Sequence, residues 1–244
     1  MTFVSGTCRI CLNNFPNLSW DHVPPQGCGN NYSTNNTRYR DSFDSVAKYK
    51  TSQNGIKFQT VCRQCNSDLG TKYDPDLIRV FTNAKLMLSI KEFSWNFILK
   101  INGINVIAAL YGHFLAANVH SKATRYDIEM RDWLMSDLSS IPPINLFYYF
   151  HPGDNSFVAR DYAYVEWVNN LKHQAVIAVI KFFPFGFVAT DEPYFHGLPK
   201  VNDNLFFGRR YERPYYWLEE PPENGFILAS ELQDESIRGL RKYV

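Results

Sequence analysis

The spacing of hydrophobic residues along the chain predicts helices first and strands later. Apolar residues at helical spacing predict helices over residues 77–90, 105–119 and 126–138. Runs rich in aromatic and β-branched residues predict strands over residues 93–101, 145–150, 157–167 and 174–189, the last folded back at Pro184-Phe185-Gly186. His113 stands alone in an apolar helix and is expected to be a satisfied core histidine rather than a metal ligand. Helices followed by aromatic-rich strands predict an α+β fold.

The first 76 residues follow a different pattern, with short extended segments separated by polar stretches. Residues 21–23 are expected to form a strand that ends at Pro24-Pro25, because proline cannot continue a β-ladder. Asn54-Gly55 predicts a tight hairpin turn between strands over residues 46–51 and 56–62. The polar segment between the first strand and this hairpin is expected to be a long loop.

Four of the five cysteines form two C-x2-C pairs, Cys8/Cys11 and Cys62/Cys65. Two residues between paired thiols is the spacing that lets both sulfurs bind one tetrahedral Zn²⁺, and four thiolates complete a closed structural site. Paired cysteines in a chain that shows no export signal favour a metal over disulfides. The sequence therefore predicts a four-cysteine zinc site, with Cys28 left as a free thiol in a loop.

A closed zinc site offers no coordination position for chemistry, so any reaction requires other residues. Asp21 and His22 lie between the two cysteine pairs, and Asn66 directly follows the last thiol. Asn66 or Ser67 is expected to cap a short helix that stops at Gly70. This order of strand, loop, strand and helix is expected to bring Asn66 across from His22.

These residues and their order resemble the HNH (ββα-metal) endonucleases, in the variety whose finger is held by a four-cysteine zinc site, over roughly the first 75 residues. The resemblance implies hydrolysis of phosphodiester bonds in nucleic acid, with DNA as the expected substrate. It also implies that His22 is the general base and that Asp21 and Asn66 hold Mg²⁺ or a similar divalent cation. Adjacent strand residues point to opposite faces, so Asp21 and His22 need a local distortion if both are to face a phosphate.

A change in composition near residue 76 predicts two units, an HNH-type zinc and nuclease domain over residues 1–76 and an α+β domain over residues 77–244. All five cysteines precede Lys72, glutamate is absent before Glu92, and an Asp-Pro turn signal lies between them. The second unit is expected to fold independently and to bind substrate, sense a regulatory partner or form a homo-oligomer. A nuclease with such an added domain resembles bacterial effectors of antiviral defence.

Composition limits the classes of partner. Hydrophobic residues at 45% and charged residues at 20% indicate a globular protein. The net charge of +1 gives no overall signal for nucleic acid, so any basic surface must be local. Without an apolar segment long enough to span a bilayer or a secretory signal, the expectation is a cytoplasmic protein that does not contact membranes. The alternative function is a catalytically silent zinc-binding module for protein or nucleic-acid interaction.

Overall fold

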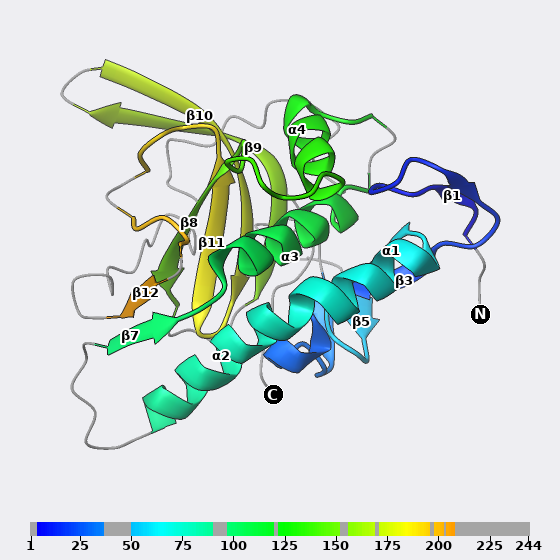
Figure 1. Cartoon of the computed structure of the whole chain (residues 1–244), viewed down its shortest axis with the longest axis horizontal. Coiled ribbons are helices and arrows are strands. Elements are labelled where there is room, and N and C mark those ends of the chain that lie inside the picture. The colour runs from blue at the N-terminus through cyan, green and yellow to red at the C-terminus, as the bar shows by residue number, and fades with distance from the viewer. Residues whose placement is uncertain are drawn as a thin grey trace.

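The chain combines helices with small antiparallel sheets, so the predicted α+β fold class is confirmed (Figure 1). This computed structural model describes residues 4–36, 50–89, 97–119, 122–151, 156–168, 171–195, 198–202 and 204–207. Within these ranges, no helix has the length and apolar character needed to cross a membrane.

The largest sheet has four antiparallel strands in the order β8-β11-β10-β9. Their bounds are Asn145–Phe150 for β8, Phe157–Val168 for β9, Leu171–Phe182 for β10 and Phe185–Thr190 for β11. The predicted turn at Pro184 is confirmed, because Phe182 and Phe185 are paired across it. A separate two-stranded sheet pairs β7 (Phe97–Lys100) with β12 (Asn204–Phe207). β7 falls within the strand predicted over residues 93–101, of which residues 93–96 lie outside the described part of the chain.

Helix α3 (Gly103–Ala116) lies in front of the four-stranded sheet (Figure 1). It begins where the Asn102 side chain accepts a hydrogen bond from the Asn105 N–H at 3.3 Å. Nearly all of its side chains are buried, because the helix is hydrophobic almost all round. Helix α4 (Arg125–Leu134) begins with a capping box formed by Thr124 and Asp127. The two predicted helices over residues 105–119 and 126–138 are therefore confirmed, with shifted ends.

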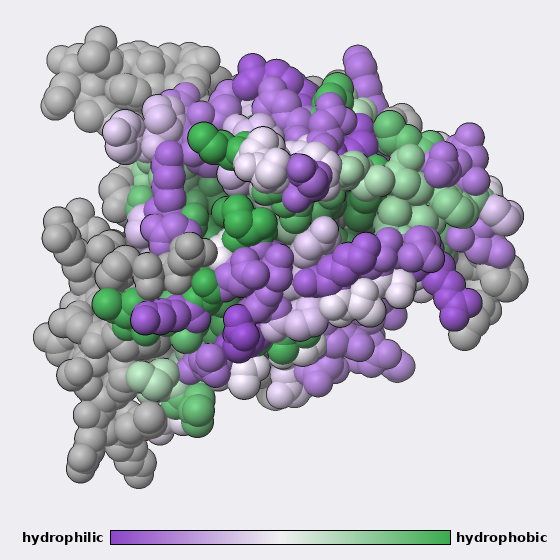
Figure 2. All heavy atoms as spheres, viewed as in Figure 1, coloured by the Kyte–Doolittle hydropathy of each residue, from purple (hydrophilic) through white to green (hydrophobic). Residues whose placement is uncertain are grey.

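Helix α2 (Asp74–Ser89) packs against the sheet through one aromatic side chain. The ring of Phe81 lies 5.3 Å from that of Phe185 and 6.4 Å from that of Phe182, in edge and tilted geometries that aromatic pairs favour. The exposed surfaces of α2 and α4 are largely hydrophilic, as Figure 2 shows for the face viewed in Figure 1. The hydrophobic periodicity of residues 77–90 thus marked the face of α2 that meets the sheet.

One helical run extends from the second cysteine pair into α2. Helix α1 (Arg63–Asp68) is followed by a π-helical turn, η3 (Leu69–Tyr73), and α2 begins at the next residue. The predicted stop at Gly70 and the predicted Asp-Pro turn are therefore wrong. The missing N–H of Pro75 falls just after the π turn, where the regular hydrogen-bond pattern is already interrupted. The unit boundary at residue 76 lies inside α2, and the division into two folding units stays a prediction.

The N-terminal region contains three short antiparallel pairs. Strand β1 (Gly6–Thr7) pairs with β2 (Asn14–Phe15), β3 (Ser19–His22) with β6 (Lys57–Val61), and β4 (Thr34–Asn36) with β5 (Lys50–Ser52). The predicted end of the first strand before Pro24-Pro25 is confirmed. The predicted pairing of the two segments around Asn54-Gly55 is wrong, because β5 and β6 each pair with a different strand; residues 46–49 lie outside the described ranges.

A single hydrophobic cluster includes residues from both sides of residue 76. Ile56, Phe58 and Leu69 belong to the same buried cluster as Phe114 of α3. Helix α3 approaches the π turn closely, since a Cβ at Gly112 would lie 2.3 Å from Cδ2 of Leu69. The N-terminal region therefore packs directly against α3.

Candidate functional site

The two cysteine pairs come together where β6 meets α1. The four sulfurs of Cys8, Cys11, Cys62 and Cys65 all lie within 4.8 Å of one another, and none forms a disulfide. Four sulfurs around one tetrahedral zinc at about 2.3 Å would lie roughly 3.8 Å apart. The distance from Cys11 Sγ to Cys62 Sγ is 3.9 Å. These four cysteines could hold a metal ion such as zinc.

Backbone geometry prepares both cysteine pairs for this arrangement. The first pair occupies a turn in which the Leu12 N–H donates to the Cys8 carbonyl at 3.0 Å. In the second pair, Cys62 is the N-cap of α1, and its sulfur accepts from the Cys65 N–H at 3.4 Å. The Cys62 N–H donates to Cys8 Sγ at 3.2 Å and so joins the two pairs. Asn66 is therefore inside the helix, and the prediction that it or Ser67 caps the helix is wrong.

The environment of Cys8 favours the form that binds metal. A hydrogen bond from Cys65 is the main cause that lowers the pKa of the Cys8 thiol to about 4, against an opposing effect of burial. The same hydrogen bond is the main cause that raises the pKa of the Cys65 thiol, so Cys8 is the member of this pair that ionises first, to the thiolate form that binds metal. Cys28 behaves differently: it is fully buried at the end of η1 (Gln26–Cys28), and burial is the main cause that raises the pKa of its thiol. Cys28 is a free thiol, as predicted, but it lies in this short 3-10 turn and not in a loop without regular structure.

Asp21 and His22 lie next to an irregularity in the β3–β6 ladder. Ser19 pairs with Val61, whereas Asp21 pairs with Phe58, so the register shifts by one residue between them. Asp21 and His22 themselves pair in regular register with Phe58 and Lys57, so the shift lies before them and not between them, where the sequence predicts a distortion. Asp21 is buried at 4% exposure and His22 is half-buried.

Asn66 fastens helix α1 to strand β3. Its Nδ2 donates to Ser19 Oγ and to the Trp20 carbonyl, both at 2.9 Å. Both acceptors belong to the two residues that precede Asp21, so Asn66 attaches α1 to the strand that carries Asp21 and His22. Its position across from His22 itself stays a prediction. No described residue forms a hydrogen bond with Asn66 Oδ1, which leaves this oxygen as an available ligand atom.

His22 has the environment of a neutral base. Burial is the main cause that lowers the pKa of His22, and it outweighs a hydrogen bond to the Asn54 backbone and the charge of Asp21, which both raise it. The Nε2 atom is buried and has no hydrogen-bond partner among the described residues. An imidazole that is uncharged near neutral pH can accept a proton from water or another group.

His113 is buried between two carboxylates. Its Nδ1 donates to Asp21 Oδ2 at 3.0 Å, and its Nε2 donates to Asp74 Oδ1 at 2.9 Å. Burial lowers the pKa of His113, but the two carboxylates outweigh this effect and raise the pKa to about 10. His113 is therefore a cation at neutral pH, with both ring N–H groups satisfied. The expectation of a satisfied core histidine is confirmed; its two partners were not identified from sequence.

Asn30 is a second residue that sequence reasoning missed. Its Nδ2 donates to the Pro24 carbonyl at 2.7 Å and to the Ile56 carbonyl at 2.9 Å, and its Oδ1 accepts from the Ile56 N–H at 2.8 Å. The side chain therefore joins the segment after His22 to the start of β6. Its position in a polar loop rich in asparagine gave no signal that one of these residues is buried.

The helix after Asn66 offers few further ligands. Asp68 pairs with Lys72 at 3.1 Å on the surface, and Asp74 is committed to His113. Comparisons with protein-family models, with curated proteins and with solved structures gave no match to this chain. No family therefore assigns a role to Asp21, His22 or Asn66, and their roles stay predictions.

Proposed function

We propose that this chain is a metal-dependent endonuclease of the HNH type, which hydrolyses phosphodiester bonds of nucleic acid, with DNA as the substrate. The observation that carries the proposal is the His22 imidazole, whose buried Nε2 lacks a partner among the described residues. It follows Asp21 on β3, and Asn66 is bonded to the same strand. This supports a ββα arrangement of β3, β6 and α1, in which β3 carries Asp21 and His22 and α1 carries Asn66.

His22 would act as the general base. Hydrolysis requires that an attacking water lose its proton as it approaches the phosphorus. The lowered pKa keeps His22 uncharged at neutral pH, so its Nε2 can take that proton. A positioned base of this kind contributes on the order of 10²–10⁴ in rate.

The Asp21 carboxylate and the Asn66 amide supply oxygen atoms of the kind that a hard divalent cation prefers. Neither Asp21 Oδ1 nor Asn66 Oδ1 has a hydrogen bond to a described residue. One carboxylate and one amide oxygen are ligands that Mg²⁺ accepts while it keeps several waters. When bound, such a cation would supply positive charge to the scissile phosphate and the leaving oxygen. The hydrogen bond from His113 would hold the Asp21 carboxylate in one orientation, as partners of metal ligands commonly do.

The four-cysteine cluster would have a structural role. We assign zinc to it because four thiolates leave no open position for substrate. Cys65 directly precedes Asn66, and Cys8 is joined to Cys62 at the end of β6. Zinc would therefore fix the start of α1 against the turn that carries Cys8 and Cys11.

One observation favours a second function, a zinc-binding module without catalysis. Asp21 is only 4% exposed, and one of its carboxylate oxygens already bonds to His113. A carboxylate used only to neutralise a buried histidine would have this environment.

Incubation with supercoiled plasmid and with RNA, in Mg²⁺ or in EDTA, separates the two functions. The endonuclease should nick or cut nucleic acid only with the divalent cation, and His22→Ala should lose activity while it keeps its zinc and its fold. Gln64→Ala is the matched control, since Gln64 is exposed on α1 and bonds only to Asp68 among the described side chains. A folded, zinc-loaded wild-type protein that cleaves neither substrate would establish the silent module instead.

A further inference from the structure

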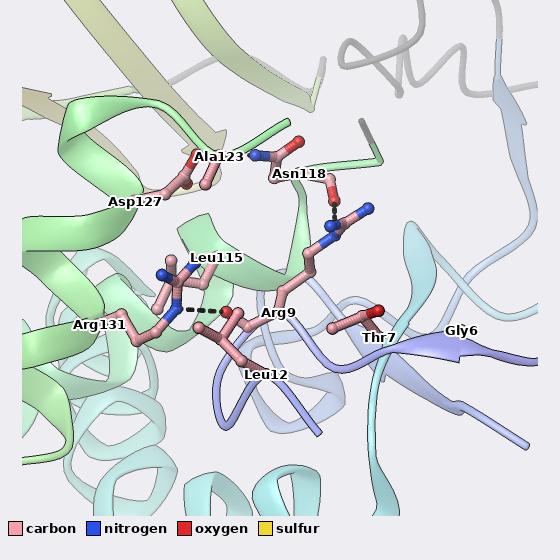
Figure 3. A pocket seen from close by; sticks show the side chains of 9 residues that line it. All are labelled: Gly6, Thr7, Arg9, Leu12, Leu115, Asn118, Ala123, Asp127 and Arg131. Atoms are coloured by element: carbon pink, nitrogen blue, oxygen red, sulfur yellow. Dashed lines mark hydrogen bonds between the residues drawn. The ribbon is translucent and has the colours of Figure 1, made fainter. Parts of the chain in front are cut away.

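A second polar site lies between the first cysteine pair and helix α4. A cavity of about 320 Å³ is lined there by Arg9, Arg131, Asn118 and Asp127, with Leu12 and Leu115 as apolar walls (Figure 3). This volume is near the lower end for small-molecule sites, which combine apolar walls with a few polar groups. None of these side chains belongs to the proposed nuclease site.

Arg131 is the unusual group in this cavity. Its side chain extends from α4, and the residue is only 7% exposed. The Nε donates to the Arg9 carbonyl at 3.1 Å, as Figure 3 shows. Its two terminal nitrogens have no acceptor among the described residues. Since Arg131 lines the cavity, an anion that enters it could pair with these nitrogens, and largely buried guanidinium groups are normally paired.

Both oxygens of the nearby Asp127 carboxylate already accept hydrogen bonds. Asp127 Oδ1 accepts from Arg160 Nη2 at 2.6 Å, and Oδ2 accepts from Asn118 Nδ2 at 2.7 Å. Arg160 is fully buried and forms an ion pair with Asp127, whose other oxygen is bonded to Asn118. The positive charge of Arg131 is therefore not balanced by Asp127.

Arg9 adds a second positive charge beside the cavity. Its Nε donates to the Asn118 carbonyl at 3.1 Å (Figure 3). Burial is the main cause that lowers the pKa of Arg9, and the charge of Arg131 lowers it further, while Asp127 and the Cys8 thiolate raise it. Cys8 belongs to the metal cluster and does not line the cavity. The cavity itself therefore carries an excess of positive charge.

We propose that this cavity binds the anionic group of a small molecule, a phosphate or a carboxylate, through the terminal nitrogens of Arg131. A guanidinium presents two parallel N–H donors that match both oxyanions, so either would form a paired hydrogen bond. The Arg9 side chain raises the local positive potential, and Leu12 and Leu115 contact the apolar part of the ligand. The ligand would join the first cysteine pair to α4 and so stabilise the folded chain by mass action.

The test uses the full chain with its zinc. We expect sodium phosphate or sodium butyrate to bind saturably in titration calorimetry, with a dissociation constant on the order of 1 mM. Sodium chloride at equal ionic strength should show no saturable heat. Binding of phosphate alone or of butyrate alone supports the site and assigns its ligand class.

Two substitutions locate the site. Arg131→Gln should weaken anion binding at least tenfold, and Arg131→Lys, which keeps the charge but loses the two parallel donors, should weaken it several-fold. Arg125→Gln is the matched control on the same helix, because Arg125 is exposed and pairs with Glu129 and Asp191 on the surface. If Arg131→Gln fails to fold, the comparison of Arg131→Lys with Arg125→Gln decides.

The absence of saturable binding of both anions to the wild-type chain would overturn the proposal. Unchanged affinity in folded Arg131→Lys and Arg131→Gln would do the same. A short DNA duplex is the last probe: if it requires Arg131 while neither small anion binds, the cavity belongs to a nucleic-acid interface and the small-molecule site is refuted.

Discussion

Nδ1 of His113 lies 3.0 Å from Oδ2 of Asp21, although 92 positions separate the two residues in the chain. His113 comes from the middle of α3, whereas Asp21 comes from β3. The contact places a residue of the predicted second unit directly behind a predicted metal ligand. It also predicts that the candidate nuclease site depends on α3 for its geometry.

Replacement of His113 tests this dependence. We expect His113→Gln to lower the free energy of unfolding by about 3–5 kcal/mol, because it leaves the buried Asp21 and Asp74 without their cation. Cleavage should fall as well if Asp21 holds the catalytic cation. Urea unfolding and plasmid nicking measure the two effects. Ile104→Ala, at a partly exposed position of the same helix, should change neither by a comparable amount.

The same ion pairs predict how stability depends on pH. The pKa of His113 is raised to about 10 in the folded chain, above the ordinary value of 6.5 that applies when it is unfolded. Its stabilising effect should be complete below the unfolded value and should disappear as the pH rises through the folded one. The difference in unfolding free energy between wild type and His113→Gln should therefore shrink between pH 6.5 and pH 10. A constant difference over this interval, with zinc present throughout, would contradict a charged His113.

Asn66 should tolerate neither alanine nor aspartate. Its amide donates two hydrogen bonds to β3, and alanine removes both donors together with the available Oδ1. Aspartate keeps an oxygen but cannot donate, and its charge would face the Trp20 carbonyl. We expect cleavage to be lost in both variants. Wild-type rates for Asn66→Asp would show that the two hydrogen bonds are dispensable and that only an oxygen ligand is needed.

The cysteines should separate into two classes. Cys62→Ser should lose the metal and misfold the N-terminal region, because its sulfur belongs to the cluster and also caps α1. Cys28→Ala should keep about one zinc per chain, as expected for a four-ligand structural site. Cys28→Ser should keep the metal too, but a buried hydroxyl without a partner should cost about 1–3 kcal/mol of stability. Elemental analysis and thermal unfolding distinguish these results, and loss of zinc from Cys28→Ala would contradict the assignment.

A 1–76 fragment measures how far the two predicted units fold separately. The fragment lacks His113, and it also lacks the Ala116 carbonyl that accepts from Thr60 Oγ1 at 2.5 Å. We expect it to be less stable than the same region in the full chain and to cleave more slowly at matched salt. Hydrogen exchange of both proteins provides the comparison. Equal protection and equal rates would show that the N-terminal unit is self-sufficient.

Local patterns in the sequence predicted the regular elements of the second half well. Helix α3 and strands β8 and β11 are strongly apolar, and β9 and β10 are rich in aromatic and β-branched residues, so their sequence patterns were decisive. Prediction failed at the start of a helix and at a hairpin turn, where the residues do not have their usual role. A cysteine rather than Asn66 caps α1, and the turn at Asn54-Gly55 joins strands that pair elsewhere.

The candidate site was only partly accessible from sequence for a different reason. The sequence shows directly the two-residue spacing within each cysteine pair and the position of Asn66 after the second pair, although Cys8 and Cys62 are 54 positions apart. The partners of His113 lie 92 and 39 positions away, and no local pattern encodes such contacts. A lone histidine in an apolar helix was the one available sign that buried carboxylates would be found beside it.

The helical run from Arg63 to Ser89 has a mechanical consequence. At the helical rise of 1.5 Å per residue, it is a rod of about 40 Å that carries Asn66 near one end and Phe81 against the sheet near the other. A tilt of this rod at the sheet would displace Asn66 relative to His22. The helix would bend at the π turn Leu69–Tyr73, because the regular hydrogen-bond pattern changes there. A movement of the sheet against α2 would thus change the position of Asn66 relative to His22 in the proposed nuclease site.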